Sequence, residues 1–89
     1  MSDLIKYAGE RRKYEIDVSL AMSPGENLFS LHSITESTNE LDIDAETPTA
    51  NIVSFFVSGG TTLSEYNIVI KFTTDQGADL EARITLLVR

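Results

Sequence analysis

Apolar and polar residues alternate with a period of two along most of the chain, which is the pattern of half-buried β-strands. The C-terminal stretch is the clearest example, because five apolar residues share one face: Leu80, Ala82, Ile84, Leu86 and Val88. A second run just upstream places four more on one face: Tyr66, Ile68, Ile70 and Phe72. Between the two runs, Gly77 supplies the positive φ that a hairpin turn needs. Residues 64–89 are therefore predicted to form one long antiparallel hairpin.

Three shorter strands are predicted nearer the N-terminus. The first has an alternating apolar face that ends at the turn dipeptide Pro24-Gly25, and this face consists of Tyr14, Ile16, Val18 and Leu20. A less regular run covers residues 27–34, and a third strand begins at Leu41. Residues 44–49 are predicted to be a mobile loop, because Pro48 cannot donate a ladder hydrogen bond.

Residues 50–58 form the most apolar stretch, and both faces of this strand are apolar. The pattern predicts a strand that is central in its sheet or has one face against a partner. Phe55 and Phe56 are adjacent, so they point to opposite faces, and the outward ring is a candidate interface anchor. Phe55 and Phe56 are thus the candidate partner-binding residues. The alternative is that the N-terminal segment or a loop covers the outward ring.

The strand count and one tyrosine predict the fold. No window shows an apolar face of period 3.6, and six or seven short strands at this spacing imply an all-β sandwich or a small barrel. A glycine turn precedes Tyr66, and immunoglobulin-like domains often carry a tyrosine there whose hydroxyl bonds back to the turn. The predicted fold is an all-β, immunoglobulin-like antiparallel β-sandwich of about seven strands.

Charge is distributed unevenly over the 89 residues, which are enough for one small domain. The net charge is −7: residues 1–13 hold four bases and two acids (+2), and residues 14–89 hold three bases and twelve acids (−9). An acidic body repels a phosphate backbone, so we expect no nucleic-acid partner. Residues 1–12 lack a sustained apolar period and are predicted to be a flexible basic arm, with residues 13–89 as a single domain.

Side chains suited to catalysis are scarce. The chain has no cysteine, which excludes disulfides, thiol nucleophiles and thiolate zinc sites. His32 is the single histidine, and it cannot form a dyad with Ser33, because neighbours on a strand point to opposite faces. We predict no catalytic residues and no cofactor, and therefore no enzyme. No apolar run approaches about 18 residues, so no membrane association is predicted.

One acidic run offers an alternative. Asp42, Asp44 and Glu46 would share one face of a regular strand, and such carboxylates can hold calcium if a loop wraps around them. The EF-hand spacing and its glycine are missing. The other interpretation, a solvated face whose charges block edge-to-edge pairing, is the one we adopt, so no metal site is predicted.

Three motifs give the chain a family resemblance: Y-x-I-D-x-S at residues 14–19, SGGT-x4-Y at residues 58–66 and T-T-x2-G at residues 73–77. With them, residues 14–89 resemble small tailed-phage and prophage proteins known as phage fibre-tail adaptors or Ig-like virion proteins. The resemblance implies a non-enzymatic virion structural protein, made in the bacterial host cytoplasm. It would join neck, tail or fibre components through protein–protein contacts, and its copies would form a homo-oligomer or assemble on a symmetric partner in the particle.

Two other kinds of binding module are alternatives. A free-standing Ig-like binding or protease-inhibitor module would present long loops with hydrophobic tips, whereas the loops expected here are short and polar. A carbohydrate-binding module would need exposed coplanar aromatic rings, and the chain has no tryptophan.

Overall fold

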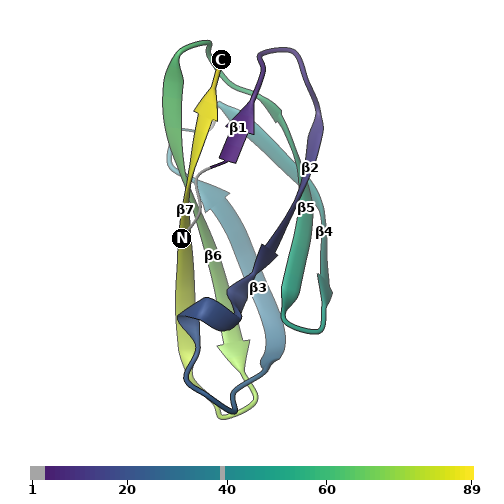
Figure 1. Cartoon of the computed structure of the whole chain (residues 1–89), viewed down its shortest axis with the longest axis vertical. Coiled ribbons are helices and arrows are strands. Elements are labelled where there is room, and N and C mark those ends of the chain that lie inside the picture. The colour runs from purple at the N-terminus through teal and green to yellow at the C-terminus, as the bar shows by residue number, and fades with distance from the viewer. Residues whose placement is uncertain (1–3, 39) are drawn as a thin grey trace.

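The computed structural model describes residues 4–38 and 40–89. Over these residues the chain forms seven β-strands in two sheets and one turn of 3-10 helix (Figure 1). In chain order the elements are β1 (Leu4–Lys6), β2 (Arg12–Asp17), η1 (Val18–Ala21), β3 (Leu28–Glu36), β4 (Leu41–Thr49), β5 (Ile52–Gly59), β6 (Ser64–Thr74) and β7 (Asp79–Val88).

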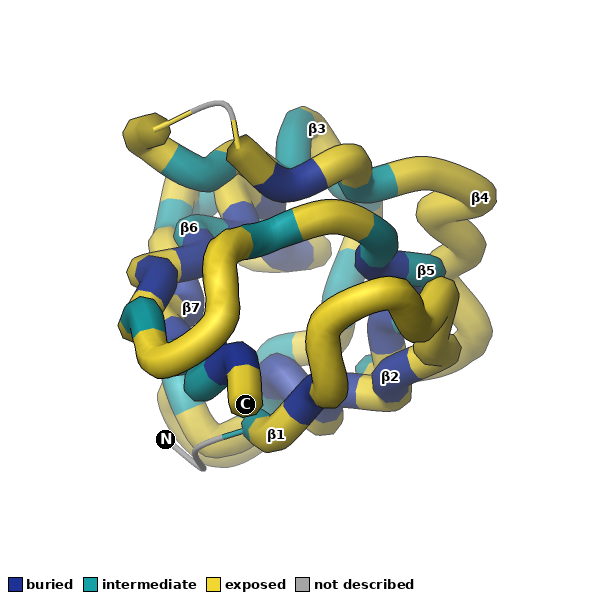
Figure 2. The backbone as a smooth tube through the Cα atoms, turned by 90° about the horizontal axis from the view of Figure 1, so that it is seen from above, coloured by how far each residue is buried: buried dark blue, intermediate teal, exposed yellow. Residues whose placement is uncertain are grey.

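The two sheets pack face to face around one core, and buried residues alternate with exposed ones along the strands (Figure 2). The larger sheet has the order β1-β7-β6-β3 and the smaller one the order β2-β5-β4. All pairs are antiparallel except β1 with β7. This order is that of an immunoglobulin-like domain whose first strand lies beside the last. The prediction of an all-β sandwich of about seven strands is confirmed.

The C-terminal hairpin is confirmed as β6 and β7, which pair from Ser64 with Val88 to Thr73 with Asp79. The predicted inward residues are buried, apart from Leu80, which is half-buried. Gly77 in the turn has a φ of +83°. The turn forms where the sequence predicted it because the Thr74 hydroxyl accepts the backbone N–H of Ala78 at 3.2 Å, while Gly77 takes the left-handed conformation.

β5 is the central strand of the smaller sheet, which is one of the two alternatives predicted from its two apolar faces. Its inward side chains, Val53, Phe55 and Val57, are completely buried. The Phe55 ring packs at 6.2 Å, centroid to centroid, from the ring of Tyr14 on β2. Burying each such side chain contributes about 1.5–3 kcal/mol, so β5 is the main core strand of its sheet.

The predicted continuation of the first strand beyond Asp17 is wrong. The Asp17 carboxylate accepts the backbone N–H of Ser19 at 3.0 Å and begins η1. Leu20, predicted to face inward, is instead 78% exposed. A local side-chain cap therefore decides the conformation here, although the apolar alternation continues through it.

The prediction of a loop at residues 44–49 is also wrong, because β4 runs on to Thr49 and pairs with β5. A bulge between Asp44 and Thr47 absorbs the irregularity, with Ala45 at a φ of +54°. Pro48 is tolerated because β4 is an edge strand, where every second N–H has no neighbouring strand to bond. The reversal of the chain is therefore displaced to Ala50 and Asn51.

β3 pairs with β6 through two shifts of register, one between Leu28 and Ser30 and one between Leu31 and Ser33. These bulges explain why the apolar pattern of this strand is irregular. Phe29 and His32 fall at the two shifts, and both are exposed. Bulges re-aim side chains at sheet edges, and β3 is the edge of its sheet.

The predicted N-terminal arm lies against the sandwich from Leu4 onward. β1 pairs with β7, and Lys6 is completely buried, with its ammonium donating to the carbonyl oxygen atoms of Tyr7 at 3.0 Å and Gly59 at 2.8 Å. Residues 1–3 lie outside the described part of the chain. The flexibility of the arm in solution stays a prediction, because it concerns motion.

Candidate functional site

Phe55 and Phe56 point in opposite directions, and Phe56 is the one on the outer face of the smaller sheet. It lies between Lys13 of β2 and Asp44 of β4 in one cross-strand row. Phe55 is completely buried, so it is not accessible in the folded chain. The half-buried Phe56 is therefore the accessible aromatic side chain of the pair.

Arg11 covers part of the Phe56 ring. Its guanidinium carbon lies 4.0 Å from the ring centroid, and its Nη2 donates to both carboxylate oxygen atoms of Asp44, at 3.2 and 3.1 Å. The side chain of Arg11 is 50% exposed and that of Asp44 57% exposed. The N-terminal segment thus contributes a cation to the same surface, and the ring is left between a positive and a negative group.

A hollow of about 220 Å³ lies beside this row on the same face. It is lined by Lys13, Glu15, Thr49, Ile52 and Ser54. Ile52 is 40% exposed, and the ammonium of Lys13 lies 3.7 Å from the Glu15 carboxylate. The outer face of the β2-β5-β4 sheet therefore has an apolar centre with a charged rim, which is the general composition of protein interfaces.

The acidic run of β4 does not form a cluster. Asp44 is bound to Arg11, and the bulge after Asp44 interrupts the regular alternation before Glu46. Within residues 4–38 and 40–89, no three histidine, aspartate or glutamate side chains lie close enough to hold a metal ion. The described carboxylates thus act as separate surface charges.

His32 forms an exposed chain of hydrogen bonds with Thr73 and Asp79, and Ser33 takes no part in it. Its Nε2 contacts the hydroxyl of Thr73, and that hydroxyl donates to the Asp79 carboxylate at 2.8 Å. The hydroxyl proton is thus directed at Asp79, and the oxygen lone pair faces the imidazole. A histidine in this position does not take the proton, so the arrangement does not activate a nucleophile.

Tyr66 has the position predicted for it. Its hydroxyl accepts the backbone N–H of Thr61 at 2.7 Å and donates to the Glu40 carboxylate at 2.5 Å. The preceding turn needs glycine, because Gly59 has a φ of +84° and a Cβ there would lie 2.7 Å from the carbonyl oxygen of Glu40. This glycine turn therefore has a structural role.

Three side chains have shifted pKa values, and each shift has a structural cause. Burial raises the pKa of Tyr14. Hydrogen bonds from Ser19 lower the pKa of Asp17. Burial by itself would raise the pKa of Glu36, but the hydrogen bonds from Thr38, Leu41 and Glu40 together outweigh it, and the pKa is lowered. None of the three lies in the cross-strand row that contains Phe56.

The comparison with protein families decides the class. Residues 6–87 match the family described as the podophage GP4 fiber-tail adaptor protein gp77. The chain belongs to this fibre-tail adaptor family. The match supports the resemblance seen in the sequence, and it makes this chain a member of a phage tail family. A comparison with curated proteins finds no match. No helix in the described part of this adaptor is long and apolar enough to cross a membrane.

Two exposed side chains of this adaptor were missed by sequence analysis. Coverage of the outward ring by the N-terminal segment was the alternative interpretation, but no spacing rule identifies Arg11 as the residue, because the contact exists only after β2 pairs with β5. Phe29 is 76% exposed at the first bulge of β3, and the irregular pattern of residues 27–34 was the available signal.

Proposed function

We propose that this chain is a non-enzymatic virion component that joins neck, tail or fibre proteins by protein–protein contacts. Membership of the fibre-tail adaptor family supports the role. The docking surface is the outer face of the β2-β5-β4 sheet, and its anchor is Phe56. The observation that carries this choice is the half-buried aromatic ring in a row of opposite charges, between Lys13 and Asp44.

Arg11 and Phe56 act together in this proposal. The ring offers apolar area, and the guanidinium stacked on it offers donors to a carboxylate or a carbonyl oxygen of the partner. Aromatic residues and arginine are the residues most often found at interface hot spots. The alternative of an inhibitor module would need a protruding loop, whereas the reversals at residues 50–51 and 75–78 are short.

The remaining features of the function follow from charge and family. The partners are proteins of the virion, and copies of the adaptor assemble with each other or on a symmetric partner in the particle. The protein is made in the host cytoplasm and ends in the virion. The net charge of −7 opposes association with nucleic acid or an anionic membrane surface.

Particle incorporation tests the proposal. Phage that lack their own copy of the adaptor gene are complemented with wild type, Phe56→Ala or Val69→Ala, and the adaptor in purified particles is quantified by mass spectrometry. Val69 is the matched control, because it is a half-buried apolar residue of the other sheet. Losing a hot spot of about 2 kcal/mol weakens binding about 30-fold, so Phe56→Ala is depleted from particles and Val69→Ala is not. Equal incorporation of all three proteins would refute Phe56 as the anchor.

A further inference from the structure

The sandwich is closed on one side and open on the other. On the closed side the chain passes from β1 in one sheet to β2 in the other, and the Tyr14 hydroxyl donates to the carbonyl of Ile5 at 2.7 Å. On the open side, β3 and β4 are the free edges of the two sheets. Their inward apolar side chains pack on the core but stay only half-buried: Leu28, Leu31, Ile34 and Ile43.

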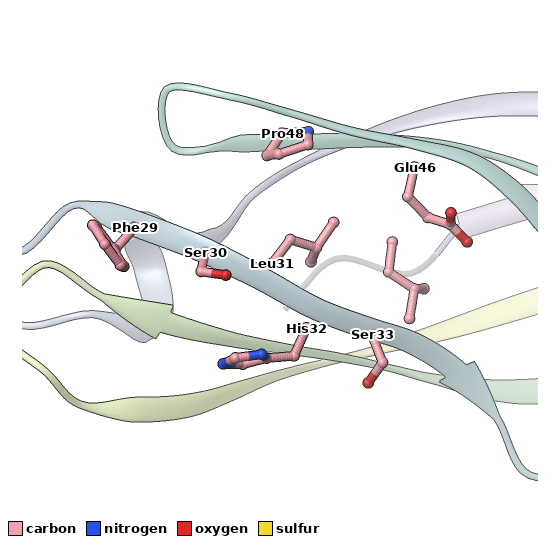
Figure 3. A pocket seen from close by; sticks show the side chains of 8 residues that line it. Phe29, Ser30, Leu31, His32, Ser33, Glu46 and Pro48 are labelled. Atoms are coloured by element: carbon pink, nitrogen blue, oxygen red, sulfur yellow. The ribbon is translucent and has the colours of Figure 1, made fainter.

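A groove of about 680 Å³ lies between these two edges, and we name it the edge groove. Figure 3 shows Leu31 of β3 in the space below Pro48 and Glu46 of β4. A smaller hollow of about 300 Å³ continues it toward Glu36 and Asp42, and Ile34 lines both. We include this smaller hollow in the edge groove, which therefore follows β3 from Phe29 to Glu36.

The two edges differ in how they are protected against an added strand. β4 carries a bulge, a proline and three acids, all of which discourage pairing. β3 has no acid or base other than His32 between Leu28 and Thr35. Its two bulges lie at residues 28–33, and residues 33–36 then pair with β6 in regular register. Residues 33–36 thus form a regular sheet edge that has no neighbour on its outer side among the described strands.

The charge of the edge groove decides what can occupy it. Its rim carries three carboxylates, those of Glu46, Glu36 and Asp42, and no lysine or arginine lines the part of it that the structure describes. A second copy of this chain would bring a net charge of −7 and the same acidic β4 to the contact. A segment with lysine or arginine side chains is complementary, and an extended segment fits a sheet edge.

We propose that the edge groove binds an extended segment of a virion partner, in which apolar side chains alternate with lysine or arginine. The segment adds as a strand along residues 33–36, its apolar side chains lie on Leu31 and Ile34, and Phe29 packs against its end. This inference rests on the proposed adaptor function, since a protein that joins two components needs two separate surfaces. The edge groove and the Phe56 face meet that need, because they lie at the free edge and on the outer face of β4.

Two synthetic peptides test the inference, one with valine alternating with lysine over about nine residues and one with glutamate in place of lysine. Each carries fluorescein, and binding to the full chain is followed by fluorescence anisotropy. The lysine peptide is expected to bind at least about tenfold more tightly than the glutamate peptide. Peptide binding is expected to shift the amide resonances of residues 33–36 in a 15N-labelled sample.

Matched variants test whether the lysine peptide binds in the edge groove. Glu46→Lys and Phe29→Ala each weaken the lysine peptide about tenfold, because they remove the complementary charge and the exposed ring. Glu15→Lys makes the same charge change on the other hollow, and Leu20→Ala removes an equally exposed apolar side chain on η1, so both leave binding within about twofold. All four residues are exposed at the surface, and the variants are expected to fold.

Three results would overturn the inference. They are equal affinity for the two peptides, an equal loss in Glu15→Lys and Glu46→Lys, and amide shifts confined to elements other than β3 and β4. A dimer in sedimentation experiments that Phe29→Ala abolishes would assign the groove to a second copy instead. If the peptide fails to bind but Phe56→Ala is still depleted from particles, the groove inference fails and the adaptor function stands. If the peptide binds as expected while Phe56→Ala is incorporated normally, the edge-groove inference is supported and Phe56 is not the anchor of the docking surface.

Discussion

The guanidinium carbon of Arg11 lies 4.0 Å from the centre of the Phe56 ring, although the two residues belong to segments far apart in the sequence. The same guanidinium donates to Asp44, so one side chain joins the N-terminal segment to two strands of the smaller sheet. Because the Arg11 side chain is 50% exposed, its stacking on the ring contributes about 0.5–1 kcal/mol, and the ion pair adds less than about 1 kcal/mol.

Arg11→Ala should therefore lower the free energy of unfolding by about 1 kcal/mol, measured by urea denaturation at low salt. Part of this loss of stability should disappear at high salt, because salt screens the Arg11–Asp44 ion pair of the wild-type protein. Arg83→Ala is the control, because Arg83 also pairs with a carboxylate, Glu81, at 2.9 Å but is not stacked on a ring in the described part of the chain. If Arg11→Ala unfolds at the same urea concentration as the wild type, the contact with Phe56 adds nothing to stability.

The Phe55→Ala and Phe56→Ala variants should differ in thermal stability. Phe55→Ala leaves a cavity in the core and is expected to destabilise the fold by about 3 kcal/mol or more. Phe56→Ala removes a half-buried surface ring and should cost about 1 kcal/mol. Differential scanning calorimetry of the two variants checks the difference. If both melt equally early, both rings belong to the interior and the docking face lies elsewhere.

Tyr14 should make stability depend on pH at the alkaline end. Burial raises its pKa above the ordinary value of 10.0, so the folded chain holds the phenolic proton more tightly than the unfolded chain. The stabilisation is fully present below about pH 10 and is lost as the pH rises through the raised folded value. A phenolate also cannot donate to the Ile5 carbonyl, which the hydroxyl does at 2.7 Å.

Melting curves of wild type and Tyr14→Phe from about pH 8 to pH 11.5 test this expectation. At pH 8 the variant should be about 1 kcal/mol less stable, because it lacks one hydrogen bond. Above pH 10 the difference should shrink, because the unfolded wild-type chain gains stability by releasing the Tyr14 proton, which the folded chain still holds. A difference that stays constant with pH would contradict the assignment.

Amide exchange tests the flexibility of the N-terminal arm. Ala8 donates to the Arg89 carbonyl at 2.9 Å, at the end of a parallel strand pair only three residues long. We expect its amide to exchange by local opening, much faster than the amides of Ile68 and Ile70 in β6. Equal protection across these amides would mean that β1 unfolds only with the core, and that the arm is not flexible.

The parts of the fold that the sequence predicted are those with local signals. The β6–β7 hairpin combines alternating faces with a glycine turn, and the Tyr66 hydroxyl reaches a turn only five residues away. A central position was one of two alternatives predicted for β5 from its two apolar faces, and the other was a face against a partner. Each signal lies within one or two neighbouring elements, so no knowledge of distant contacts was needed.

The errors arose where a local contact or a sheet neighbour outweighs alternation. The Asp17 cap turns the chain into η1, and it is a single hydrogen bond that a pattern of apolar residues does not reveal. The bulge in β4 lets residues 47–49 pair with β5, and Pro48 is acceptable only because the strand is an edge. A position at the edge is a property of the sheet and cannot be read from the strand itself.

The amino-acid sequence by itself determined the strand content, the C-terminal hairpin, the tyrosine–turn contact, the scarcity of catalytic side chains and the family resemblance. Only the tertiary structure decided which phenylalanine of the central strand faces outward, that Arg11 covers it, and that the edges β3 and β4 enclose a groove with an acidic rim. The physical reason is the distance along the chain over which each interaction acts. Alternation and turn chemistry act between near neighbours, whereas a surface is built by strands that the chain brings together from distant positions.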